Sequence, residues 1–119
     1  MRPLTERSSR VVDAVKLQRR TERIAAGRFL AEGPNLVEAA ARRGLVDVVF
    51  VTEAAGERYL SLLIDLPVCP VTDRAMRALS ETVTPAGLVA VCRLPGESLD
   101  DILADNPALI VVAVDISDP

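Results

Sequence analysis

The spacing of apolar residues predicts helices over much of the chain. Between Arg7 and Ala26 apolar side chains recur at helical spacing, and Gly27 is a suitable residue to end that helix. Three shorter helices are expected, Leu36–Arg43, Glu57–Ile64 and Asp73–Leu79. Gly44 is expected to end the first of these, and Asp73 to cap the last.

Strands are predicted where apolar residues follow one another with little interruption. They are expected at Arg28–Glu32, Val46–Val51, Val68–Val71 and Leu88–Cys92. Apolar runs without polar alternation are typical of parallel strands that helices cover on both faces. Because helices and strands alternate, the pattern predicts an α/β fold, a three-layer α/β/α sandwich with a largely parallel sheet.

The pattern changes after residue 94. A Pro-Gly step interrupts the alternation, and Ser98–Ala104 is expected to form a short acidic helix. Ala108–Val114 reads as a buried strand, and such a strand needs neighbours on both sides. We therefore expect a fragment that ends as a second domain begins. The predicted division is a first domain at 1–94, a linker at 95–107, and the first strand of a truncated second domain at 108–119.

Composition removes several classes of chemistry. The chain of 119 residues is half apolar, enough for a core without metal or disulfides. It has no histidine, which excludes Ser-His-Asp and Cys-His nucleophiles and most zinc sites. With two Phe, one Tyr and no Trp it cannot build an aromatic platform for bases. Neither a Walker A nor a G-x-G-x-x-G motif occurs, so nucleotide-binding enzymes are poorly supported.

The cysteines and the N-terminus bear on where the protein works. Cys69 and Cys92 each lie in an apolar run, which favours two reduced, buried thiols over a disulfide or a reactive site. The first ten residues contain no apolar signal region, and the longest apolar run is far shorter than a membrane span. We expect a cytoplasmic protein with no membrane partner.

Charge is distributed unevenly along the chain. The net charge is −3, yet residues 1–28 hold eight basic and three acidic groups, and residues 61–119 hold three basic and nine acidic groups. A basic arm on an acidic body favours a localised phosphate-binding surface, and the alternative is a solvated helix face. The candidates for phosphate contact are Arg19, Arg20, Arg23 and Arg28.

The turn at Gly33-Pro34-Asn35 is a second candidate. It opens a helix, and the free N–H groups of a helix N-terminus favour an anion. Asn35 can cap this helix or reach a base edge. Glu32, at the end of the preceding strand, can hold Arg23 or Arg28 in position for RNA or can form a simple surface ion pair.

Three segments in order carry a family resemblance. They are RRTERIAAGRFLAEGPNLVEAAARRG, VTDRAMRALSETVTPAGLVAVCR and VVAVDISDP. In order and spacing the chain resembles the SpoU family of the SPOUT superfamily, the RNA ribose 2′-O-methyltransferases. It is most similar to the ribosomal-RNA enzymes of the thiostrepton-resistance type, and the resemblance covers nearly the whole chain.

The resemblance implies two domains with different functions. The first domain would fold like the kink-turn-binding ribosomal proteins and bind RNA. The catalytic SPOUT domain, which holds S-adenosylmethionine and forms the homodimer, would follow it. This fragment would therefore hold no catalytic, cofactor-binding or metal-binding residue. The implied RNA-binding residues are Arg19, Arg20, Arg23, Arg28, Glu32, Gly33, Asn35, Thr84, Pro85 and Gly87. Ala86 departs from the family, which usually has glutamine between the proline and glycine of this loop.

The resemblance thus implies the RNA-recognition domain of an S-adenosylmethionine-dependent RNA ribose 2′-O-methyltransferase, with 23S ribosomal RNA as the implied substrate, while the residues themselves leave ribosomal and transfer RNA both open. The fragment is expected to bind RNA without catalysing the reaction. One alternative is a free-standing RNA-binding protein of the kink-turn ribosomal class. Another is a protein-interaction domain that uses the acidic C-terminal half, which only the net charge supports.

Overall fold

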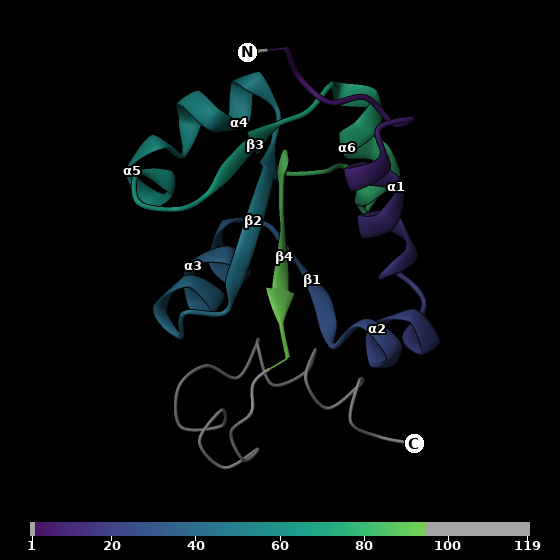
Figure 1. Ribbon diagram of the computed structural model, residues 1–119. Helices are drawn as coiled ribbons and strands as arrows, with labels where there is room; N and C mark the ends of the chain where they lie inside the picture. The colour runs from purple at the N-terminus through teal and green to yellow at the C-terminus, as the bar shows by residue number, and fades with distance from the viewer. Residues whose placement is uncertain (1, 95–119) are drawn as a thin grey trace.

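The computed structural model describes residues 2–94 and contains one four-stranded sheet between helices (Figure 1). The helices are α1 (Ser9–Lys16), α2 (Arg20–Ala26), α3 (Pro34–Arg42), α4 (Glu53–Arg58), α5 (Leu60–Leu63) and α6 (Asp73–Leu79). The strands are β1 (Arg28–Glu32), β2 (Val46–Val51), β3 (Val68–Pro70) and β4 (Leu88–Arg93). The predicted linker, acidic helix and terminal strand lie outside the described residues.

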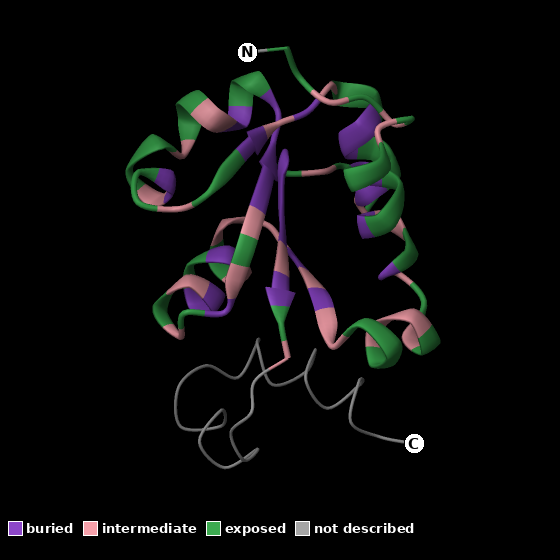
Figure 2. Ribbon diagram, viewed as in Figure 1, coloured by how far each residue is buried: buried purple, intermediate pink, exposed green. Residues whose placement is uncertain are grey.

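The predicted three-layer sandwich is confirmed by how the two faces of the sheet are covered. One face packs against α3 and α5, and its buried side chains include Phe29, Val37 and Leu63. The other face packs against α1 and α6, with Val11 and Phe50 among its buried side chains. Figure 2 shows the sheet as the buried centre between exposed outer helix surfaces.

The expectation of a largely parallel sheet is wrong. The strand order is β1-β4-β2-β3, and only β2 and β3 pair in parallel, because β4 is antiparallel to both of its neighbours. Ser80, directly after α6, donates to the Glu32 carboxylate, and Glu32 is paired with Val89 near the start of β4, so the chain stays at this end of the sheet between α6 and β4. The chain therefore enters β4 where β2 ends, and the Thr52 amide donates to the Gly87 carbonyl at 3.0 Å.

The helix predicted from Arg7 to Ala26 is divided into α1 and α2. The interruption is held from both sides, since Arg23 Nη1 donates to the Leu17 and Gln18 carbonyls at 3.2 and 3.0 Å. Gln18 Nε2 in turn donates to the Ala78 carbonyl at 2.9 Å. The break separates α1, which buries part of its face, from α2, which has no buried residue. Gly27 ends α2 with φ 65°, as expected.

Two further boundaries differ from the prediction. The helix expected at 57–64 begins earlier and is divided into α4 and α5. The threonine that precedes each of α4 and α6 is the cap: Thr52 Oγ1 accepts from the Ala55 amide at 3.2 Å. Thr72 Oγ1 does the same for α6, so Asp73 is the first helical residue and not its cap.

Both cysteines are free and buried, as predicted. Burial, with a smaller contribution from the charge of Asp47, raises the pKa of the Cys92 thiol to about 12. A thiol that stays protonated is a poor nucleophile, which argues against a reactive role for Cys92. Within residues 2–94, no helix is long and apolar enough to cross a membrane.

Candidate nucleic-acid interface

The predicted RNA-binding residues lie at two opposite ends of the sheet. β1 runs from Arg28 to Glu32, a rise of about 13 Å. We call the turn at residues 32–35 together with the loop at 80–87 the loop end. The arginine end lies at the start of β1 and holds Arg19, Arg20, Arg23, Arg28, Arg42, Arg43 and Arg93. The structure therefore separates the four predicted arginines from the other six predicted residues.

Glu32 fastens the loop at 80–87 to the end of β1. Its carboxylate accepts from the Ser80 hydroxyl, from the Glu81 amide at 3.1 Å, and from the Thr82 hydroxyl at 2.9 Å. The prediction that Glu32 holds Arg23 or Arg28 is therefore wrong. Both arginines belong to the other end of the strand, and the partners of Glu32 come from 48 to 50 residues further along the chain.

Gly87 fixes the other side of this loop. It is buried with φ 93°, and a Cβ atom there would lie 2.8 Å from both the Ala55 Cβ and the Thr52 Oγ1. Its role in this structure is therefore close packing against the start of α4. Thr84 is exposed and Pro85 half-buried, so these two predicted residues remain accessible. Val83 is fully exposed at 102%, an apolar side chain that no described residue covers.

The turn before α3 lies beside this loop. The Gly33 amide donates to the Leu88 carbonyl at 3.1 Å, which ties the turn to the start of β4. Gly33 is the N-cap of α3, and no side chain caps the helix. Asn35 lies inside the first turn and is exposed, so the alternative that it caps α3 is wrong. Its amide is left available to a ligand.

A cleft of about 420 Å³ opens between the loop and the helices α4 and α6. Its walls include Thr84, Pro85 and Gly87 from the loop, and Arg58 and Arg77 from the helices. Both arginines are exposed, and neither forms an ion pair with a described residue; Arg58 lies 5.4 Å from the Tyr59 ring centroid. Neither arginine could be predicted to lie beside the loop from the sequence, because no motif links these helices to it.

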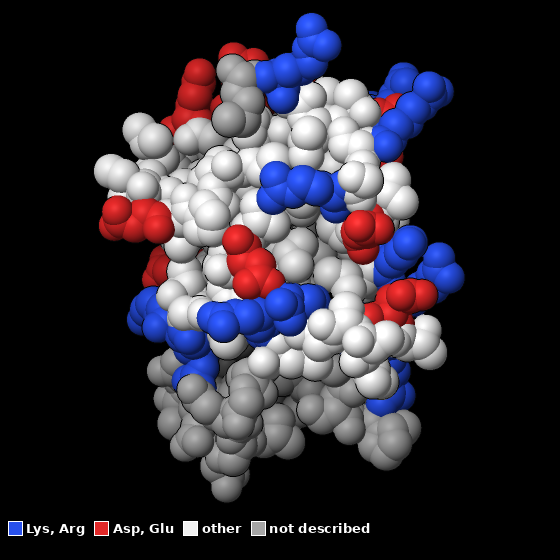
Figure 3. Space-filling view, in the orientation of Figure 1, with Lys and Arg blue, Asp and Glu red and all other residues white. Residues whose placement is uncertain are grey.

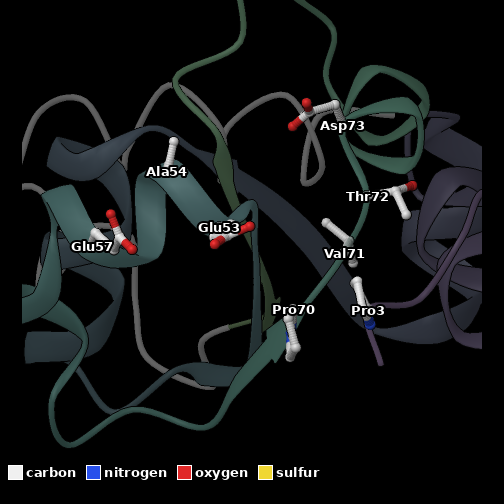
Figure 4. Close-up of a pocket in the computed structure, with 8 residues that line it drawn as sticks. All are labelled: Pro3, Glu53, Ala54, Glu57, Pro70, Val71, Thr72 and Asp73. Carbon is white, nitrogen blue, oxygen red and sulfur yellow. The ribbon is translucent and has the colours of Figure 1, made fainter. Parts of the chain in front are cut away.

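The hollow beside this cleft is lined by acidic side chains and no basic ones, and it shares Asp73 with the cleft. It measures about 730 Å³ and is lined by eight residues, Pro3, Glu53, Ala54, Glu57, Pro70, Val71, Thr72 and Asp73 (Figure 4). Its three carboxylates are spread around the hollow, and among the described residues no group of three or more acidic or cysteine side chains could hold a metal. The hollow has three carboxylates and no arginine in its walls, whereas the cleft has Asp73 together with Arg58 and Arg77, so the cleft is the more favourable of the two for a phosphate.

The arginine end is partly neutralised by Asp47. This carboxylate lies 2.5 Å from Arg28 Nε and 3.6 Å from Arg93 Nε. Arg23 donates hydrogen bonds to the backbone carbonyls of Leu17 and Gln18, directly after α1. Figure 3 shows basic side chains gathered across the lower part of the described surface, with acidic side chains among them.

A comparison with protein families identifies the domain. The family model described as the MRM3-like substrate binding domain matches residues 8–90. The chain belongs to this family. The resemblance to the substrate-binding domain of SpoU-family RNA methyltransferases is thereby confirmed. No curated protein sequence matches the chain.

Solved structures agree with this MRM3-like substrate-binding domain. An RNA 2′-O ribose methyltransferase is 26% identical with a TM-score of 0.73, over 82% of this chain and 40% of that one. The SpoU methyltransferase AviRb from Streptomyces viridochromogenes, solved with AdoMet, is 25% identical with a TM-score of 0.63, over 79% and 38%. An rRNA methyltransferase from Sinorhizobium meliloti, 19% identical with a TM-score of 0.64 over 84% and 39%, shares the fold.

The MRM3-like domain therefore spans about two fifths of the length of these relatives. The family match at residues 8–90 includes the whole loop end and most of the arginine end. Arg93 alone of the residues named at the arginine end lies outside the matched range.

Proposed function

We propose that this domain binds the RNA substrate of a ribose 2′-O-methyltransferase, and that the RNA lies at the loop end. The family is a substrate-binding domain, and two similar structures at 25–26% identity are named as RNA ribose or SpoU methyltransferases. The observation that carries the location is the cleft between α4, α6 and the loop that Glu32 fastens, with two unpaired arginines in its wall.

The chemistry of the cleft suits an RNA segment whose bases are not all paired. Arg58 and Arg77 can each present a guanidinium fork to phosphate oxygens. Thr84 and Asn35 offer polar groups for base edges or ribose hydroxyls, and the exposed Val83 offers an apolar contact to a base face. Proteins that recognise an RNA sequence reach unpaired bases in loops and bulges more readily than bases inside an RNA helix.

For the whole protein we propose methyl transfer from S-adenosylmethionine to a ribose 2′-hydroxyl of 23S ribosomal RNA. The relative solved with AdoMet supports this cofactor for the family. We further propose that the longer protein is a cytoplasmic homodimer. These proposals rest on relatives of which this chain covers about two fifths.

Binding measurements with short fragments of 23S ribosomal RNA test the site. We expect the double variant Arg58→Gln/Arg77→Gln to bind at least about tenfold more weakly, since one charge-assisted contact contributes about 1.5–3 kcal/mol. The control Arg7→Gln/Arg10→Gln lowers the net charge equally, from exposed positions away from the cleft, and should have a much smaller effect. Equal weakening by the two pairs, or no RNA binding by the parent chain, would contradict the proposal.

A further inference from the structure

The arginine end concentrates positive charge on a small part of the domain. Seven of the fourteen Lys and Arg residues of the chain lie there. The acidic residues of the elements around them are Glu22 in α2, Glu38 in α3 and Asp47 in β2. Among the described residues, the arginines at this end outnumber these acidic residues, although the chain as a whole has a net charge of −3.

The arrangement of these arginines follows from the strand register. Arg28 and Arg93 are paired directly across β1 and β4, and Asp47 lies between their guanidinium groups. Arg93 also donates to the Gly44 carbonyl, which brings the C-terminal end of α3 to the same edge. Two arginines that share a single carboxylate leave one positive charge uncompensated.

Other guanidinium groups at this end have capacity for a ligand. Arg19 is exposed and precedes α2. Arg20 has two buried nitrogens, Nε and Nη2, with no hydrogen-bond partner. Arg42 lies 3.8 Å from Glu38, and both side chains are more than half exposed, so this ion pair contributes little to stability. The exposed guanidinium groups of Arg19 and Arg42 can donate directly to a phosphate, whereas the two buried nitrogens of Arg20 reach one only if that side chain turns outward.

The two ends are connected by the strands between them. β1 and β4 extend from the loop end to the arginine end, and a strand of this length spans about 13 Å. A nucleic-acid strand carries one phosphate per about 3.4 Å of rise, so about four nucleotides cover that distance. An RNA held in the cleft can thus reach the arginine end without leaving the surface of the domain.

We propose that the arginine end is a second contact surface for the phosphate backbone of the same RNA. This inference rests on the proposed function, because it extends the path of the RNA bound at the loop end. The surface is composed mainly of arginines, which bind phosphate whatever the base. It should therefore add affinity and salt dependence without adding sequence preference.

The test is the salt dependence of RNA binding by the full chain, with fragments of 23S ribosomal RNA as the probe. The variant Arg19→Gln/Arg20→Gln/Arg42→Gln should lower the slope of log affinity against log salt by about two to three, since each lost phosphate contact removes about 0.7–0.9. The control Arg2→Gln/Arg7→Gln/Arg74→Gln removes the same charge from exposed positions outside the arginine end and should leave the slope nearly unchanged. Replacing the same three arginines at the arginine end by lysine should retain most of the slope.

A slope that changes equally in the two triple glutamine variants would overturn the proposal. So would a second result that concerns the acidic residues of the chain. Residues 95–119 contain six Asp or Glu and no Lys or Arg, which makes them the competing occupant of this surface. If they occupy it in place of RNA, neutralising Glu97, Asp100, Asp101 and Asp105 strengthens RNA binding, and in the parent chain the arginine substitutions leave the slope unchanged.

The two proposals fail in distinguishable ways. If the cleft proposal is wrong, the Arg58→Gln/Arg77→Gln variant binds RNA as its control does. If the second-surface proposal is wrong, the arginine-end variant has an unchanged salt slope, while the cleft variant still binds RNA more weakly. Thermal unfolding of each variant shows whether it is folded, so that weak binding can be assigned to the surface.

Discussion

Gly33 and Gly87 show how surroundings decide the role of a residue. Their φ angles are nearly equal, 91° and 93°. Nothing lies within 4 Å of a Cβ placed on Gly33, whereas a Cβ on Gly87 would overlap Ala55 and Thr52. Both were predicted to contact RNA, but the close packing makes Gly87 a structural residue of the loop.

We expect Gly87→Ala to lower the free energy of unfolding more than Gly33→Ala does. Both substitutions impose the backbone strain of a positive φ, about 1–3 kcal/mol. Gly87→Ala adds a steric overlap with Thr52, whose hydroxyl caps α4. Urea denaturation of the two variants measures the difference. Equal losses would show that α4 can shift to accept the methyl group.

Individual residues were predicted well where the signal is local. Gly27 and Gly44 have positive φ at helix ends, as their positions in the sequence indicated. Glu32 was singled out correctly as a residue with partners, but the partners themselves were wrong. Its hydrogen bonds are to residues about fifty positions away, and a single sequence contains no local pattern that reports such pairs.

At the scale of elements, the loop at 80–87 depends on one carboxylate for its anchoring. Charge-assisted hydrogen bonds contribute about 1.5–3 kcal/mol each, and Glu32 accepts three from Ser80, Glu81 and Thr82. An amide in place of the carboxylate loses the charge and one acceptor oxygen. The loop should then loosen, although the sheet below it keeps its own hydrogen bonds.

We expect Glu32→Gln to weaken RNA binding and to speed hydrogen exchange at the Glu81 amide, which donates to Glu32 at 3.1 Å. The melting temperature should fall by several degrees, since about 1 kcal/mol corresponds to about 4–8 °C in a domain of this size. The control is Glu38→Gln, which removes the same charge from an exposed ion pair on α3. Unchanged exchange at Glu81 would mean that the loop is held by other contacts.

Strands were easier to predict than the way the chain joins them. The four predicted strands are all present within a residue or two, because buried apolar runs are a strong signal. The predicted direction of β4 was wrong, since the direction depends on the end of the sheet at which the loop at 80–87 is held, and Glu32 holds that loop by tertiary hydrogen bonds. The break between α1 and α2 was missed because Arg23 and Gln18 hold it by tertiary hydrogen bonds.

At the scale of the whole molecule, the ten predicted RNA-binding residues fall into two groups that the sheet separates. The loop end has a cleft, an uncapped helix start and an accessible loop. The arginine end is distinguished by its charge, and a smaller hollow of about 310 Å³ beside it has Arg10, Asp13 and Arg28 in its walls. This division is the basis of our proposals that the loop end recognises RNA and that the arginine end attracts its backbone. The sequence predicted both charge and turn, but only the folded chain shows how far apart they lie.

The most direct test of RNA recognition at the loop end is a titration of the isotope-labelled chain with fragments of 23S ribosomal RNA, followed by amide chemical shifts. The account predicts the largest changes at Gly33, Asn35 and residues 82–87, with further changes at Arg58 and Arg77. Changes at the arginine end should weaken most as salt is raised. Shifts confined to the outer face of α1, with Arg77 and the loop at 80–87 unaffected, would contradict it.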